Sequence, residues 1–148
     1  MRIFRSVLES QEKKWLQNPL FLETKDAFMV MMEAALERAK GKSLPKDTNY
    51  VVVMWVREKE IVISAEMVVH YNRSYIHLGA DQTRQILGRK EDPVKLDTEA
   101  LRNSFSAAMY KGLRKYYEAL GGIPVYRKDL GEQTVIVADI SKACRRSA

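Results

Sequence analysis

The chain has 148 residues, of which 46% are hydrophobic and 30% are charged, and its 25 Lys and Arg against 19 Asp and Glu give a formal net charge of +6. This composition excludes a disordered or low-complexity chain, and the length is that of one ordinary domain whose core needs neither a disulfide nor a metal. We therefore expect a single domain over residues 1–148 that ends in a short basic tail over about 141–148.

Cysteine content and the N-terminal sequence indicate a reducing compartment. Cys144 is the only cysteine, so no internal disulfide is possible. The N-terminus lacks an apolar stretch of the length that a secretory signal needs, and no window approaches the ~18 apolar residues of a membrane span. We expect a cytoplasmic protein that has no membrane partner, no metal and no cofactor.

Two N-terminal segments have the apolar spacing of amphipathic helices. The first covers about residues 4–15 and ends before Pro19. The second covers 25–40 and places Met31 and Met32 on its apolar stripe. We expect these two methionines to pack on the sheet, because methionine fills irregular gaps in a core.

After a polar loop, the apolar period changes to two, which predicts β-strands. Two runs over 50–56 and 61–71 are separated by a tight turn, and a short third strand over 75–78 follows. Asp81 is then predicted to cap a short helix that ends at Gly88.

A long helix and a hairpin complete the expected order. The helix covers about 98–120, with Asp97 as its N-cap, and the hairpin strands cover 123–127 and 133–140. The helix is expected to pack through Leu101, Phe105, Ala108, Met109, Gly112, Leu113, Tyr116 and Leu120. The order α-α-β-β-β-(α)-α-β-β is that of an α+β domain, in which a three-strand meander and a C-terminal hairpin form a mainly antiparallel sheet against helices.

The turn between the first two strands determines their register. A two-residue and a four-residue turn both pair Val56 with Ile61 and Met54 with Ile63. Because side chains alternate across a strand, one sheet face is wholly apolar and must face the core. It carries Tyr50, Val52, Met54, Val56, Ile61, Ile63, Ala65, Met67 and Val69.

The opposite sheet face is the first candidate site, because it mixes aromatic, polar and titratable side chains. Its candidate interface residues are Trp55, Glu66, His70, Tyr75 and His77. This face predicts an interface with a protein partner or a second copy in a homodimer, or a stacking surface for nucleobases. The alternative is a face that the first helix or the terminal hairpin covers.

A basic surface is the second candidate site. The outer face of the long helix carries Lys111, Arg114 and Lys115, and the tail adds Lys142, Arg145 and Arg146. Two lysines four residues apart repel each other by ~0.2–0.5 kcal/mol in an isolated helix, and a bound anion would offset that cost. These six side chains are the predicted nucleic-acid-binding residues. The alternative is a solvated helix face on which Glu118 compensates Arg114.

Catalytic motifs are absent from the sequence, including the phosphate-binding loop and the GxGxxG, GxSxG and HExxH patterns. Glu66 with His70 would form an acid–base pair, and His77 could join them at a metal, whereas histidines satisfied by neighbours or water are the simpler interpretation. We expect a small basic non-enzymatic binding protein that contacts nucleic acid. The alternatives are a protein-binding regulator or homo-oligomeric structural protein that uses the sheet face, and a metal-independent nuclease.

Overall fold

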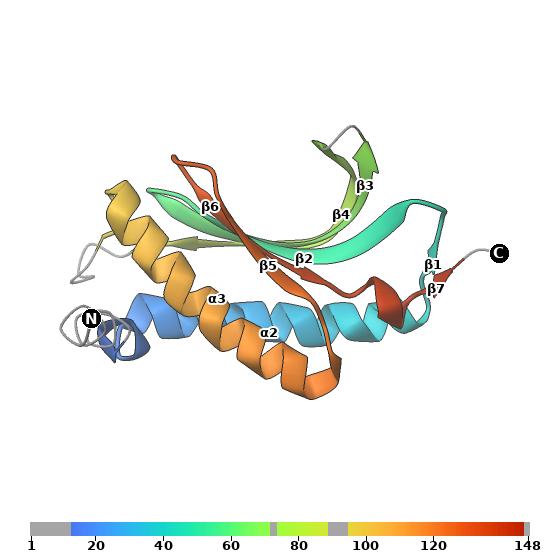
Figure 1. Ribbon diagram of the computed structural model, residues 1–148, viewed down its shortest axis with the longest axis horizontal. Coiled ribbons are helices and arrows are strands. Elements are labelled where there is room, and N and C mark those ends of the chain that lie inside the picture. Colours follow the sequence, from blue (N-terminus) through green and yellow to red (C-terminus); the bar gives the residue numbers. More distant parts are fainter. Residues whose placement is uncertain (1–12, 72–73, 89–94, 147–148) are drawn as a thin grey trace, which may run out of the picture.

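Figure 1 shows the computed structural model, which describes residues 13–71, 74–88 and 95–146. Two long helices, α2 (Pro19–Lys40) and α3 (Glu99–Gly121), lie on one face of a five-stranded antiparallel sheet of order β4-β3-β2-β6-β5. Its strands are β2 (Thr48–Val56), β3 (Glu60–Tyr71), β4 (Ser74–Leu87), β5 (Val125–Asp129) and β6 (Thr134–Asp139). A separate parallel pair joins β1 (Ser43–Leu44) to β7 (Arg145–Arg146), just after the 3₁₀ turn η1 (Ser141–Ala143). The predicted α+β class is confirmed.

Helix α2 begins six residues earlier than the apolar pattern predicts. Asn18 is its N-cap, since the side-chain oxygen accepts a hydrogen bond from the Phe21 N–H at 3.1 Å, and Pro19 occupies the first turn, where no backbone donor is needed. Asn18 and Pro19, which end the preceding helical segment, therefore also begin α2. Most of the first expected helix, over 4–12, lies outside the described residues; residues 13–16 are helical and Trp15 is buried.

The register between β2 and β3 is confirmed. Val56 pairs with Ile61, Met54 with Ile63 and Val52 with Ala65. The core face is the predicted one, and seven of its residues are at most 1% exposed: Tyr50, Val52, Met54, Val56, Ile61, Ile63 and Ala65. Met31 and Met32 are buried in the same core as Met54, with Met67 packed against it.

The prediction for the segment after the third strand is wrong. Instead of a short strand and a helix capped by Asp81, β4 is one 14-residue strand that pairs with β3 along its length, from Tyr71–Ser74 to Glu60–Leu87. The local sequence has no strong preference, and a long neighbouring strand with free hydrogen-bonding groups outweighs a weak capping signal.

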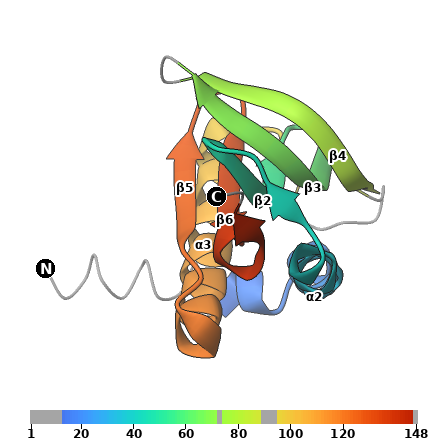
Figure 2. The same cartoon turned by 90° about the vertical axis from the view of Figure 1, so that its right-hand side faces the viewer.

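Two register shifts bend the β3–β4 hairpin. Asp81 and Leu78 are extra residues of β4, because the pairing passes from Gln82 to Ala80 and from Gly79 to His77. An extra residue on one strand increases bend and twist. The hairpin accordingly curls away from the helices, and the sheet face opposite them is concave (Figures 1 and 2).

Helix α3 differs from its prediction at the N-cap and in its buried stripe. Thr98, rather than Asp97, caps it by accepting a hydrogen bond from the Leu101 N–H at 3.1 Å. The stripe consists of Arg102, Phe105, Ser106, Met109, Leu113 and Tyr117. Tyr116 and Leu120 are 46% and 58% exposed, because the four-residue step from Leu113 reaches Tyr117, which packs against Phe28. None of the described helices combines the length and apolarity of a membrane span.

Truncating a core methionine should destabilise the fold. We expect Met32→Ala to cost about 2–5 kcal/mol, because the side chain is fully buried and leaves a cavity, and Met31→Ala to be similarly costly. Val30→Ala is the matched control, since Val30 lies on the same helix and is 61% exposed, and should change stability by no more than about 0.5 kcal/mol. Urea unfolding measures all three variants; an unchanged midpoint for both methionine variants would contradict the packing of α2.

Candidate functional site

The candidate surface is the outer face, which we define as the sheet face opposite α2 and α3. Its residues form rows that run across the strands. One apolar row contains Lys128, Val135, Trp55, Val62 and Gln85, and the next contains Tyr126, Val137, Val53, Ser64 and Thr83. The third row contains Asp139, Val51, Glu66 and Ala80. The terminal hairpin extends this face instead of covering it, because β6 pairs with β2 in the same sheet.

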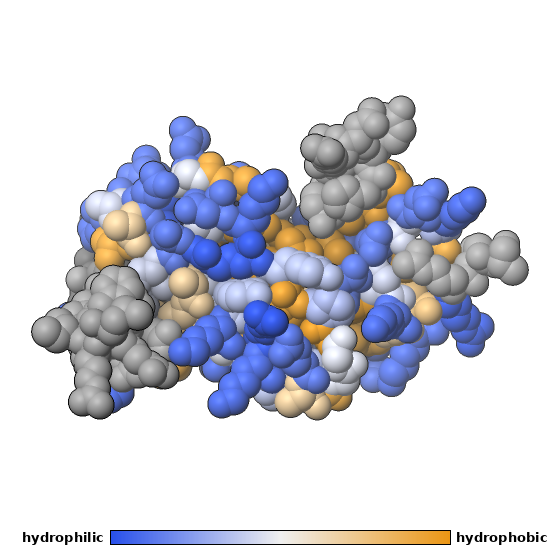
Figure 3. Space-filling model, in the orientation of Figure 1, coloured by the Kyte–Doolittle hydropathy of each residue, from blue (hydrophilic) through white to orange (hydrophobic). Residues whose placement is uncertain are grey.

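The middle of the outer face is apolar and partly enclosed by the curl of the sheet. Val51, Val53, Val68 and Val135 form a second buried cluster, separate from the main core, and Trp55 and Val137 are half-buried beside it. Both long helices lie on the other side of the sheet (Figure 2). Figure 3 shows hydrophobic surface among hydrophilic residues near the middle of the side of the molecule that faces the viewer.

Trp55 is held in place by a polar network at one end of the outer face. The Arg57 guanidinium lies 5.6 Å from the centre of the Trp55 ring and donates hydrogen bonds to Gln133 and Glu60. Gln85 also donates to Glu60, and these bonds, Gln85 first and then Arg57, hold the pKa of the Glu60 carboxyl below its usual value. Trp55 thus presents a fixed half-exposed ring.

Glu66 lies against His77; the alternative pair of Glu66 with His70 is not tested, because the His70 side chain lies outside the described part of the structure. The Glu66 carboxylate is 3.2 Å from His77 Nδ1, and the Glu66 side chain is 14% exposed against 54% for His77. The backbone pairing of His70 with Tyr75 is as predicted, but their side chains are outside the described part of the structure. Among the residues described, no group of three or more metal-ligating side chains occurs.

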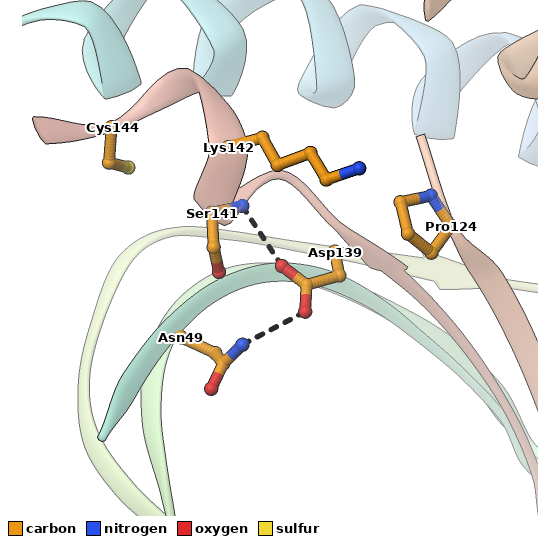
Figure 4. A pocket seen from close by; sticks show the side chains of 6 residues that line it. All are labelled: Asn49, Pro124, Asp139, Ser141, Lys142 and Cys144. Carbon is orange, nitrogen blue, oxygen red and sulfur yellow. Dashed lines mark hydrogen bonds between the residues drawn. The ribbon is translucent and has the colours of Figure 1, made fainter. Parts of the chain in front are cut away.

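A polar hollow of about 340 Å³ lies where β2 begins and β6 ends (Figure 4). The Asp139 carboxylate accepts hydrogen bonds from the Asn49 side chain and the Ser141 N–H, both at 2.9 Å. Ser141 in turn accepts one from the Tyr50 N–H. Lys142 and Cys144 complete the lining with Pro124. These bonds hold the turn from β6 into η1, and they place a carboxylate at the end of the third row.

A cluster around Asp81 was missed by sequence reasoning. The Asp81 carboxylate accepts a hydrogen bond from the Tyr50 hydroxyl at 2.5 Å and lies 3.1 Å from Lys42 Nζ and 3.7 Å from Arg38 Nε. Burial alone would raise the pKa of Asp81, but the hydrogen bonds from Tyr50 and Lys42 outweigh it and lower that pKa. No sequence signal indicated this contact, because Asp81 reaches the end of α2 only where β4 carries an extra residue.

The predicted basic residues fall into two separate groups. Lys111, Arg114 and Lys115 are exposed on α3, and Arg114 forms an ion pair with Glu118 at 2.9 Å, which is the compensation expected for a solvated face. Arg114 also donates a hydrogen bond to the hydroxyl of Tyr110. The tail group lies beside β1, where η1 contacts α2 and the Arg145 N–H donates to the Lys42 carbonyl in the β1–β7 pair. Lys142 and Arg145 are exposed; the side chain of Arg146 is outside the described part.

The Asp81 cluster predicts a loss of stability in alkali. Burial, and then the hydrogen bond to Asp81, raise the pKa of Tyr50 from 10.0 to about 12. The folded state therefore favours the neutral phenol, so this stabilisation is complete below pH 10 and disappears as the pH rises through 12. We expect Tyr50→Phe to be less stable than wild type by about 1–3 kcal/mol at pH 8, and the difference to shrink between pH 10 and 12. Urea unfolding at each pH measures this, with exposed Tyr126→Phe as the control; a constant difference would contradict it.

The chain was compared with family models, with curated proteins and with solved structures. None of the three comparisons finds a match. A function for this chain is therefore argued from its own side chains and their arrangement.

Proposed function

We propose that the protein is a non-enzymatic binding protein whose outer face contacts a protein partner. The observation that carries this proposal is the half-buried Trp55 beside a valine floor, on a sheet face that neither α2 nor α3 covers. Fixed aromatic rings in an apolar setting with a polar rim are typical of the residues that dominate protein interfaces. Tyr126, which is 57% exposed at the β5 edge, extends the same apolar area.

The charge of the outer face favours a protein over a nucleic acid at this surface. Although the chain carries a net charge of +6, the rim of the face bears the carboxylates of Glu60, Glu66 and Asp139. Arg57 and His77, which lie beside the first two, are already in contact with them. Phosphate groups beside these three carboxylates would be repelled, although Lys128 on the same face is basic. This repulsion opposes the neutralisation on which nucleic-acid binding depends.

Peptides that bind the outer face should depend on Trp55. We expect a phage-displayed library of random linear peptides, selected on the wild-type protein, to yield binders whose affinity falls by about 30-fold or more in Trp55→Ala, because truncating an anchor costs about 2 kcal/mol or more. Tyr126→Ala should also lower the affinity of these peptides. It provides a second test of the surface if Trp55→Ala does not fold. Leu120→Ala, an exposed apolar residue of α3, is the control. Fluorescence anisotropy measures affinity.

Two results would contradict the proposed surface. One is a set of selected peptides that bind Trp55→Ala and Tyr126→Ala as tightly as wild type. The other is a library that yields no binder. A second copy of the chain as the occupant would instead appear as a dimer in sedimentation that Trp55→Ala converts to monomer.

A nucleic acid is the second candidate partner, at a different surface. It is favoured by three exposed cations on one face of α3, Lys111, Arg114 and Lys115, although Arg114 already pairs with Glu118.

Replacing these three cations with Gln should reduce the affinity for duplex DNA uniformly across sequences. Each lost phosphate contact should also flatten the salt dependence by about one unit of slope. Electrophoretic mobility shifts over a salt series measure both. The triple variant would retain affinity and slope if α3 does not contact the phosphates.

A further inference from the structure

We infer that the outer face binds an amphipathic helix that lies across the strands and carries basic side chains along one flank. This inference rests on the proposed function, because it specifies the partner of the same surface. It follows from the arrangement of the rows, the curvature of the sheet and the position of two carboxylates.

The rows of the outer face differ from one another in chemistry, and two of them are apolar at their centres on β6, β2 or β3 and polar at an end. The rows through Trp55 and Val53 are mainly apolar, whereas the row through Val51 has Asp139 on one side and Glu66 on the other. Neighbouring strands are about 4.8 Å apart, and successive rows are about 6.7 Å apart along a strand. A ligand whose apolar side contacts the first two of these rows and whose charged flank contacts the third would therefore run across the strands.

The backbone of the sheet is bent about an axis that runs in that same direction (Figure 1). The extra residues Asp81 and Leu78 bend β4. Figure 1 looks nearly along the rows, so the sheet is seen in profile between its two upturned ends. A row over five strands spans about 19 Å, which matches a helix of about 13 residues at a rise of about 1.5 Å per residue. An extended peptide that followed a strand would instead cross the rows one after another.

Two carboxylates determine the charge of the partner. Asp139 and Glu66 flank Val51 in one row, on either side of a single strand. Asp139 already accepts two hydrogen bonds, and Glu66 lies against the imidazole of His77. An ionised carboxylate still has lone pairs for further donors. Lys or Arg on one flank of a helix would reach this row while the apolar side of the helix contacts the accessible apolar side chains of the other two rows, Trp55, Val62, Val137 and Tyr126. Such charge-assisted bonds are stronger than neutral ones.

The test uses a displayed library of 14-residue helical peptides with a fixed leucine stripe and flanks randomised among Lys, Glu and Gln. Selection on the wild-type protein should enrich Lys on one flank only. A selected peptide should bind Glu66→Lys at least 10-fold more weakly than it binds the wild-type protein. Glu66→Gln keeps the shape of the side chain and removes its charge, so the loss of affinity should be smaller. Glu23→Lys, an exposed position of α2 on the opposite side of the sheet, should bind as wild type does. Thermal melting confirms that each variant is folded.

The outcomes separate this inference from the proposed function. The inference of a basic helical partner fails if the selected flanks are acidic or neutral, or if a selected peptide binds Glu66→Lys as tightly as wild type. It also fails if the peptide tolerates a proline at its centre. The proposed function would still stand if Trp55→Ala removed the binding. Peptides that bind Trp55→Ala unchanged would overturn both. If the random linear library yields binders and the helical library yields none, the inference of a helical partner fails, whereas the proposal that the outer face is a binding surface stands.

Discussion

The pairing of β3 with β4 is the interaction on which the rest of the structure depends. β4 is an edge strand, and it pairs with β3 over its whole length despite two extra residues. Those residues bend the hairpin, and the bend makes the outer face concave. The same pairing brings Asp81 to the Tyr50 hydroxyl and to the cations Arg38 and Lys42 at the end of α2. The irregular pairing of β3 with β4 thus shapes the candidate surface and also connects the edge of the sheet to α2 through Asp81.

Strand β2 lies at the centre of both apolar clusters and separates two kinds of packing. On one side, Val52 and Met54 are fully buried beneath the helices. On the other, Val51 and Val53 are nearly as buried within the second cluster, although neither α2 nor α3 lies over them. Small β-branched residues suit such a face, since they pack closely without a second layer. Trp55 is too large to be enclosed in this way, and its ring remains half-exposed beside Arg57.

Charge is distributed unevenly over the molecule, and this distribution separates the two proposed partners. Cations are exposed on α3 and near the β1–β7 pair, whereas Glu60, Glu66 and Asp139 border the outer face. A polyanion and a basic helix would therefore bind different surfaces. Several of these charges also have structural partners: Arg114 pairs with Glu118, and Asp139 holds the turn into η1. Any ligand has to add to these contacts or displace them.

The sequence by itself determined the α+β order, the register of β2 with β3 and the identity of the core face, because a tight turn and strict alternation are local constraints. It also located Trp55, Glu66 and His77 on one face. Only the tertiary structure decided that β4 continues through Asp81, that Thr98 caps α3, and that Tyr117 is buried in place of Tyr116. Local preferences at these positions differ by about 1 kcal/mol or less. Pairing of β4 with β3 and packing of α3 against α2 therefore determined the outcome at Asp81 and Tyr117, and the concave surface follows from the irregular β3–β4 pairing.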